Sequence, residues 1–161
     1  MTDPGVVSVL CIDDEPLVLE VLKKFFEHEP GFSVKTCTTG KDAWEFLNAL
    51  EFDAILSDYS LPDINGIDLL KEIRERGYPG LFIIVTGKHH AKIEIDAVNY
   101  GADYYVQKGS GVVQDIPHLA EFIRTGVEKI RKNVALTESE RTWSSIIENH
   151  SDLLCCFSLQ G

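Results

Sequence analysis

The fold of this chain is decided by residues 52–66, FDAILSDYSLPDING. A short apolar run, Ala54 to Leu56, leads directly into Asp58 and then into a loop of proline, aspartate, asparagine and glycine. The run is too short for a typical helix and is bounded by turn-forming residues, so it predicts a buried strand. We therefore expect the Asp58 carboxylate at the tip of a strand.

Strand and helix patterns alternate five times along the chain. Four other apolar runs rich in β-branched or aromatic residues predict strands at 6–12, 32–37, 81–85 and 104–107. Amphipathic or helix-capped segments predict helices at 16–30, 41–50, 66–73, 93–100 and 117–132. This alternation is typical of an α/β fold, with a doubly wound five-stranded parallel sheet, helices on both faces and right-handed connections.

Composition limits the class of protein. The chain has 161 residues, of which 44% are hydrophobic, enough for one complete domain and an appendage. Its formal net charge of −11 disfavours direct contact with nucleic acid or an anionic membrane surface. The four cysteines lie at no metal-ligand spacing, and neither a leader pattern nor a membrane-spanning run is present. We expect a reducing, cytoplasmic compartment.

Polar residues follow four of the predicted strands. Since the carboxyl ends of parallel strands meet at one edge of a sheet, we expect these residues to form one site. They are Asp13, Asp14, Asp58, Thr86 and Lys108. A lone aspartate at a strand end is usually a turn former or a helix cap, but that interpretation would have to explain all five at once.

The three carboxylates predict a divalent cation, because they would repel one another unless a cation lay between them. Oxygen ligands of this kind suit Mg²⁺ or Mn²⁺. A carboxylate beside a metal, a hydroxyl and an ammonium has the partners needed to accept a phosphoryl group. The predicted edge is therefore a candidate phosphoryl acceptor site.

The chain resembles the receiver domains of two-component response regulators over about residues 6–132. The residues that carry this resemblance lie at strand ends and in the loop after the third strand: Asp13-Asp14, Asp58, Leu61-Pro62, Gly66, Thr86-Gly87 and Lys108. The resemblance implies a (βα)5 flavodoxin-like fold. It also implies that Asp58 becomes an aspartyl phosphate by transfer from a phosphohistidine of a histidine kinase or a histidine phosphotransfer protein of a phosphorelay.

The resemblance further implies a role for each residue of the site. Asp14, Asp58 and the backbone carbonyl of Tyr59 would bind Mg²⁺ directly, and Asp13 would act mainly through a water. Lys108 would pair with the phosphoryl group or with Asp58.

A switch is implied as well. The Thr86 hydroxyl would swing to a phosphoryl oxygen while Tyr105 turns inward, changing the surface of the fourth helix, fifth strand and fifth helix, where family members commonly dimerise or meet an effector. Gly109 stands where the family usually has proline.

The last 26 residues are expected to form a second part of the chain. Thr137 and Glu140 can form a capping box ahead of apolar residues at helical spacing, which predicts a further or nearly continuous helix that could also serve in a homodimer. Residues 139–154 resemble the beginning of a PAS sensor domain. We expect a receiver domain at 1–135, then a linker helix and a truncated PAS-like start at 136–161, from a receiver-PAS regulator or hybrid sensor kinase. The competing interpretation is an amphipathic tail.

Three alternative functions make different demands on the sequence. An aspartate-dependent phosphohydrolase would usually need a second acid two residues after the nucleophile, where this chain has Ser60. A flavin binder would need a phosphate-cradling loop where this chain has Asp13-Asp14-Glu15. A receiver fold used only for protein contacts, without phosphorylation, remains the alternative. As an enzyme, the segment would at most catalyse its own phosphorylation and dephosphorylation, although the parent protein could be a histidine kinase.

Overall fold

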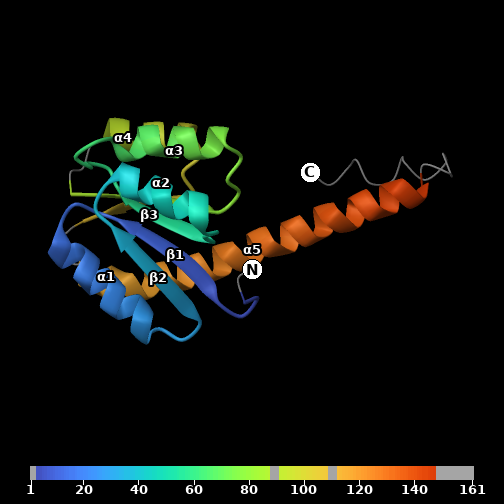
Figure 1. The fold of residues 1–161 in the computed structure, drawn as a ribbon, viewed down its shortest axis with the longest axis horizontal. Coiled ribbons are helices and arrows are strands. Elements are labelled where there is room, and N and C mark those ends of the chain that lie inside the picture. The colour runs from blue at the N-terminus through green and yellow to red at the C-terminus, as the bar shows by residue number, and fades with distance from the viewer. Residues whose placement is uncertain (1–2, 88–90, 109–111, 148–161) are drawn as a thin grey trace. The chain divides into compact units, whose positions relative to one another are not determined.

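The computed structural model describes residues 3–87, 91–108 and 112–147. Five parallel strands form one sheet in the order β2-β1-β3-β4-β5 (Figure 1). The strands are β1 (Val7–Ile12), β2 (Phe32–Cys37), β3 (Ala54–Asp58), β4 (Leu81–Thr86) and β5 (Tyr104–Gln107). The helices are α1 (Pro16–His28), α2 (Gly40–Ala49), α3 (Gly66–Glu75), α4 (Ala91–Asn99) and α5 (Val112–Ile147). The predicted doubly wound α/β fold is confirmed.

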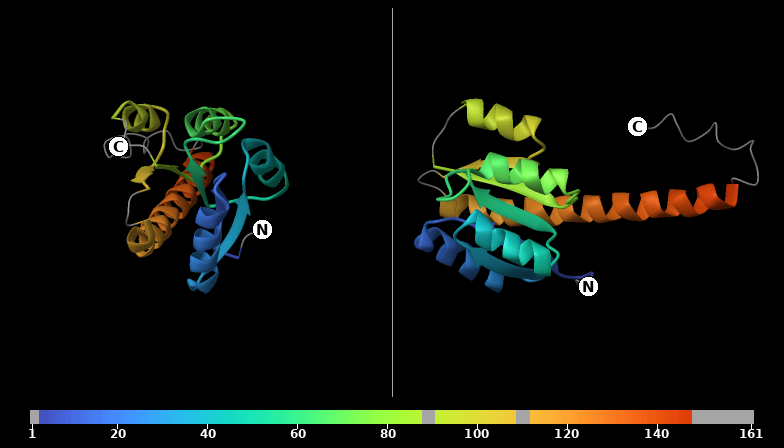
Figure 2. Two further views of the ribbon diagram at one scale, coloured as in Figure 1. Left: turned by 90° about the vertical axis from the view of Figure 1, so that its left-hand side faces the viewer. Right: turned by 45° about the horizontal axis from the view of Figure 1, so that its top comes forward.

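Helices cover both faces of the sheet. Figure 2 shows α2, α3 and α4 side by side on one face, with α1 and the start of α5 on the other. Every residue of β1, β3 and β4 is buried as a result, whereas β2 and β5 at the edges are partly exposed. A strand covered on both faces must be apolar on both, which explains the continuous apolar runs in these three segments.

The strand order places the end of β3 at the centre of the sheet. β3 pairs with β1 on one side and with β4 on the other. The order reverses at β1, because β2 lies outside it and β3 to β5 continue in the opposite direction. In open parallel sheets this reversal is where ligands bind, beyond the carboxyl ends of the strands.

The fifth helix differs from the sequence prediction. It begins at Val112 instead of near Pro117, so the proline lies inside the helix. Pro117 is the sixth residue of the helix, where proline removes the backbone donor that would bond the carbonyl four residues earlier. The helix then runs without a break to Ile147, in agreement with the nearly continuous helix expected. The chain divides into two compact units, between Val127 and Glu128.

The first part of α5 belongs to the first unit. It is anchored there by buried side chains on one of its faces: Ile116, Leu119, Ala120, Ile123 and Val127. Across the described residues, no helix combines the length and the apolar composition needed to cross a membrane.

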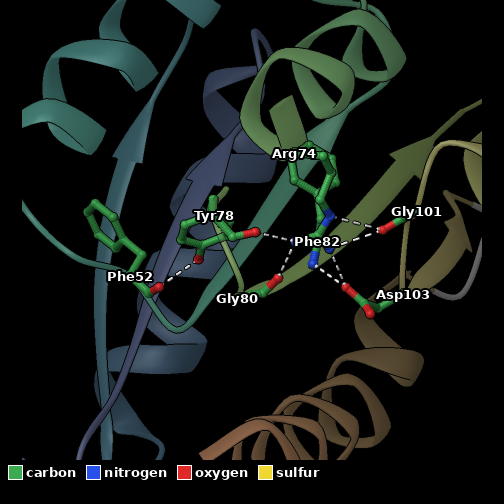
Figure 3. A network of polar contacts seen from close by, with 7 residues as sticks. All are labelled: Phe52, Arg74, Tyr78, Gly80, Phe82, Gly101 and Asp103. Carbon is green, nitrogen blue, oxygen red and sulfur yellow. Dashed lines mark hydrogen bonds and ion pairs between the residues drawn. The ribbon is translucent and has the colours of Figure 1, made fainter. Parts of the chain in front are cut away.

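A polar network joins the elements at the amino-terminal ends of β4 and β5 (Figure 3). The Arg74 guanidinium donates to the carbonyls of Tyr78, Gly80 and Gly101, at 2.8 to 3.2 Å, and pairs with Asp103 at 2.8 Å. Asp103 also accepts from the Phe82 amide, and the Tyr78 hydroxyl donates to the Phe52 carbonyl at 2.6 Å. One arginine therefore satisfies three backbone carbonyls from segments on both sides of β4.

Candidate functional site

Two buried carboxylates lie at the carboxyl ends of adjacent strands. Asp13 follows β1 and is 3% exposed, and Asp58 ends β3 and is 6% exposed. Asp14 and Glu15 are exposed on the loop after β1. One carboxylate oxygen from each of these four residues lies within 4.8 Å of the others. The sequence prediction named three of them; Glu15, which continues the same acidic run, was not included.

Lys108, directly after β5, brings its ammonium into this acidic cluster. Its Nζ lies 2.6 Å from Asp13 Oδ2, 3.1 Å from Glu15 Oε1 and 3.5 Å from Asp58 Oδ1. The Lys108 amide also donates to the Thr86 carbonyl at 2.6 Å, which fixes the lysine backbone beside the end of β4. The structure thus brings residues from three strand ends together, as the sequence predicted for Asp13, Asp58 and Lys108.

Burial and crowding of negative charge change the acidities in the cluster. Burial, together with the charge of Asp13, raises the pKa of Asp58 to about 6, although Lys108 and the Ser60 amide oppose this rise. Burial likewise raises the pKa of Asp13 against the opposing effect of Lys108. Burial alone would lower the pKa of Lys108, but its hydrogen bond and charge interaction with Asp13 raise it overall.

The cluster has the composition of a site for a small, hard cation. Among the described residues, one ammonium, that of Lys108, contacts three of the four carboxylates, so negative charge is in excess there. Carboxylate oxygens are the ligands that Mg²⁺ prefers, usually with several waters retained. The exposed Asp14 leaves the cluster open to solvent on one side, as such waters require.

The raised pKa of Asp58 predicts that, without divalent cations, the free energies of unfolding of the wild-type protein and of Asp58→Asn differ by an amount that depends on pH. The folded value of about 6 exceeds the ordinary 3.8, so between these values the folded protein holds a proton that the unfolded chain releases. Stability from this group is therefore lost as the pH rises through this window. Relative to wild type, Asp58→Asn should gain up to about 3 kcal/mol across the window and nothing further above it. Urea unfolding in chelator at several pH values measures this, and a pH-independent difference would contradict it.

The loop after Asp58 is held in one conformation by backbone contacts. The Tyr59 amide donates to the Val85 carbonyl, and the Tyr59 carbonyl accepts from the Gly66 amide, both at 2.8 Å. A Cβ at Gly66 would lie 2.6 Å from the Asp58 carbonyl oxygen, so only glycine fits there. The Ser60 amide donates to the Asp58 carboxylate, and Ser60 forms an antiparallel bridge with Asn65.

These contacts bear on which backbone carbonyl faces the cluster. The Tyr59 carbonyl, which the resemblance implied as a metal ligand, is directed at Gly66. In an extended residue the amide and the carbonyl point to the same side of the strand. Because the Ser60 amide points to the Asp58 carboxylate, its carbonyl is the better placed of the two.

Thr86 and Tyr105 lie on neighbouring strands at the same edge. Thr86 ends β4, is 2% exposed and pairs in register with Gln107. Tyr105 pairs with Ile84, two residues further from the edge, and is partly buried against the core. Burial, with the charge of Glu94 on α4, raises the pKa of its hydroxyl. Tyr105 is therefore placed between the strand ends and α4. Gly109, which stands where the family usually has proline, lies outside the described residues.

Comparison with known proteins agrees with this geometry. Residues 9–114 match the family described as the response regulator receiver domain. The response regulator SaeR of Staphylococcus aureus strain USA300 is 35% identical over 100 residues, which are 62% of this chain and 43% of SaeR. The aligned region thus spans less than half of that relative.

Solved structures show the same fold. A receiver domain protein from Methanospirillum hungatei JF-1, described as CheY-like, is 26% identical with a TM-score of 0.72, covering 80% of this chain and 98% of that one. The response regulator domain of Thermotoga maritima CheB is 30% identical with a TM-score of 0.69, covering 76% of this chain and 97% of that one.

Proposed function

Because the chain belongs to the family of response regulator receiver domains, we propose that Asp58 is its phosphoacceptor and takes its phosphoryl group from a phosphohistidine of a histidine kinase or a phosphotransfer protein. One observation carries this assignment: a buried carboxylate lies at the reversal of the strand order, 3.5 Å from the Lys108 ammonium and inside a cluster of four acids. The raised pKa of Asp58 agrees with a carboxylate whose charge becomes better stabilised when a cation such as Mg²⁺ binds beside it.

Receiver domains bind Mg²⁺ through acidic residues, and the acidic cluster fits that ion. We assign Asp14 and Asp58 as direct ligands and Asp13 as a ligand through water. For the backbone ligand, the Tyr59 carbonyl stays a prediction, but the orientation of Ser60 favours the Ser60 carbonyl. Mn²⁺, with similar ligand preferences, also stays a prediction.

The transfer itself requires little from the protein beyond position and charge. An Asp58 oxygen attacks phosphorus, the phosphorus–nitrogen bond of the phosphohistidine breaks, and its electron pair stays on the departing imidazole. A bound Mg²⁺ would neutralise charge on the phosphoryl oxygens. Lys108, now held mainly by Asp13, would pair with one phosphoryl oxygen, and the Thr86 hydroxyl would donate to another.

The output would be a changed surface. The phosphoryl group would carry nearly two negative charges near Thr86, in place of the single charge of the free Asp58 carboxylate, which biases the arrangement of Thr86, Tyr105 and α4. On this surface α4 exposes Ile95 at 59% and Val98 at 66%, and β5 exposes Tyr104 at 47%. A second copy of the chain or an effector would bind here, and dimerisation through this surface or through the C-terminal helix stays a prediction.

We also propose how this chain fits into a larger protein. We keep the receiver boundary at residue 135 and the PAS-like start after it. Of the stretch 139–154 that resembles a PAS start, residues 148–154 lie outside the described residues. A receiver-PAS regulator, a hybrid sensor kinase and a cytoplasmic location stay predictions. The alternative function is a receiver fold that serves only as an interaction surface.

The deciding experiment is phosphoryl uptake by the wild-type protein. We expect acetyl phosphate or phosphoramidate to add one phosphoryl group, seen by intact mass, in Mg²⁺ but not in chelator. Reduction of the aspartyl phosphate with borohydride would convert Asp58 to homoserine, and peptide mass analysis locates that change. Absence of an adduct with either donor, in a protein shown to bind Mg²⁺, would favour the interaction module.

A further inference from the structure

We propose that Asp63 is a positioning residue, which ties the loop after the phosphoacceptor to the beginning of α2 and so fixes the geometry of the metal and phosphoryl site. The inference rests on the proposed function of Asp58. Asp63 lies five residues after Asp58, on the exposed side of the loop, and is not among the four acids of the cluster.

The Asp63 carboxylate binds the amino-terminal end of a different element. Its Oδ1 accepts from the Gly40 amide and its Oδ2 from the Lys41 amide, each at 2.9 Å. The backbone amides of Asp63 and Ile64 also favour the charged form of this carboxylate. Although burial opposes it, these hydrogen bonds together lower the pKa of Asp63, so the carboxylate remains charged.

The contact completes the first turn of α2. A helix leaves its first amides without partners inside the helix, and a carboxylate there is favoured by both hydrogen bonding and the helix dipole. Thr39, the N-cap residue, accepts from the Asp42 amide at 3.0 Å. The two preceding amides are satisfied by Asp63 from 22 and 23 residues away along the chain. The start of α2 is thus capped in part by its own N-cap and in part by the loop.

Packing reinforces the tie. A Cβ on Gly40 would overlap the Ile64 side chain, so the absence of a side chain at Gly40 lets the loop approach α2 this closely. The loop is also closed on itself by the bond between the Gly66 amide and the Tyr59 carbonyl and by the bridge between Ser60 and Asn65. Because the loop is closed at both ends, attaching its middle residue, Asp63, to α2 holds the whole loop in place.

The loop in turn sets the orientation of the phosphoacceptor. The Ser60 amide donates to the Asp58 carboxylate, and the Ser60 carbonyl, which an extended residue directs to the same side as its amide, is the candidate backbone ligand. If the Asp63 tie is lost, Ser60 is free to shift, and both the Asp58 carboxylate and the backbone ligand lose their fixed position. Such outer contacts commonly change metal affinity or activity by about 10- to 100-fold.

The test compares two residues that cap the same helix. Asp63→Ala removes the cap and the tie, Asp63→Asn keeps one acceptor oxygen, and Thr39→Ala removes only a cap. Calorimetric titration with Mg²⁺ and the rate of phosphoryl uptake from acetyl phosphate are measured for each, beside thermal unfolding. We expect Asp63→Ala to weaken Mg²⁺ binding and to slow uptake by about tenfold or more, with Asp63→Asn between it and the wild type. Thr39→Ala should lose thermal stability but stay within about twofold of the wild type in both readouts.

Two results would overturn the inference. One is an equal loss of Mg²⁺ affinity and uptake rate in Asp63→Ala and Thr39→Ala, which would reduce Asp63 to a helix cap. The other is wild-type affinity and rate in Asp63→Ala. Failure of the wild-type protein itself to take up a phosphoryl group would instead contradict the proposed function, and the Mg²⁺ titrations would still decide the role of Asp63.

Discussion

Asp58→Asn is expected to take up no phosphoryl group from acetyl phosphate or phosphoramidate under conditions that label the wild-type protein fully. The asparagine oxygen carries no negative charge, so it is neither an adequate nucleophile towards phosphorus nor a strong ligand for Mg²⁺. Asparagine keeps the shape of the aspartate side chain, so the packing at the buried end of β3 is preserved. Intact mass analysis with and without Mg²⁺ measures the loss.

A second readout separates the two reasons for this loss. If Asp58 is a metal ligand, Mg²⁺ should raise the unfolding temperature of the wild-type protein and raise that of Asp58→Asn much less, because a ligand stabilises only the state that binds it. Glu75→Gln, which removes an exposed carboxylate on α3, serves as the matched control and should behave as wild type in both assays. A phosphoryl adduct on Asp58→Asn would show that another side chain is the acceptor.

Lys108→Met is expected to change Mg²⁺ binding and phosphoryl uptake in opposite directions. The ammonium lies within 3.5 Å of three carboxylates, so it occupies part of the negative field that a metal ion would use. Its removal should tighten Mg²⁺ binding. The same removal deletes a cation that stabilises charge on the phosphoryl oxygens, and loss of one such group commonly costs about 100-fold or more in rate.

Stability in the absence of metal gives an independent check on Lys108→Met. The variant leaves Asp13 buried without its 2.6 Å partner, and breaking a buried ion pair in this way costs about 3 kcal/mol. Mg²⁺ should restore much of the loss. Lys23→Met, on the exposed face of α1, is the control and should change none of these quantities. A parallel fall in Mg²⁺ affinity and uptake would mean that Lys108 holds the ligands in place instead of competing with the metal.

The architecture could be predicted because the spacing of apolar residues in the sequence differs between strands and helices. Strands covered on both faces must be apolar throughout, and β3 and β4 therefore read as short continuous runs, while α1 repeats its apolar residues at helical spacing. Parallel pairing then brings the strand ends to one edge, which was sufficient to place Asp58, Asp13 and Lys108 together. That part of the site depends only on the order of the elements.

The remaining features depend on the path of the backbone between elements. Successive residues of an extended segment direct their carbonyls to opposite sides, so a shift of one residue decides whether Tyr59 or Ser60 faces the cluster. The sequence pattern does not show this shift. The contact of Asp63 with α2 joins segments more than twenty residues apart through a loop whose closure is not visible in any periodicity. Glu15 was accessible to sequence reasoning, because it continues the acidic run, but its reach to Lys108 needed the geometry of both loops.

The Arg74 network decides how the sheet comes apart. β5 has four residues and one neighbouring strand, and an edge strand of that kind ordinarily frays by itself. Here Asp103, at the entrance to β5, is bonded both to the Arg74 guanidinium and to the backbone of Phe82 in β4. Separation of β5 from β4 also requires the ion pair between Asp103 and Arg74, near the end of α3, to break. We therefore expect β4 and β5 to open as one cooperative unit, with their amide protons exchanging with solvent through a shared opening.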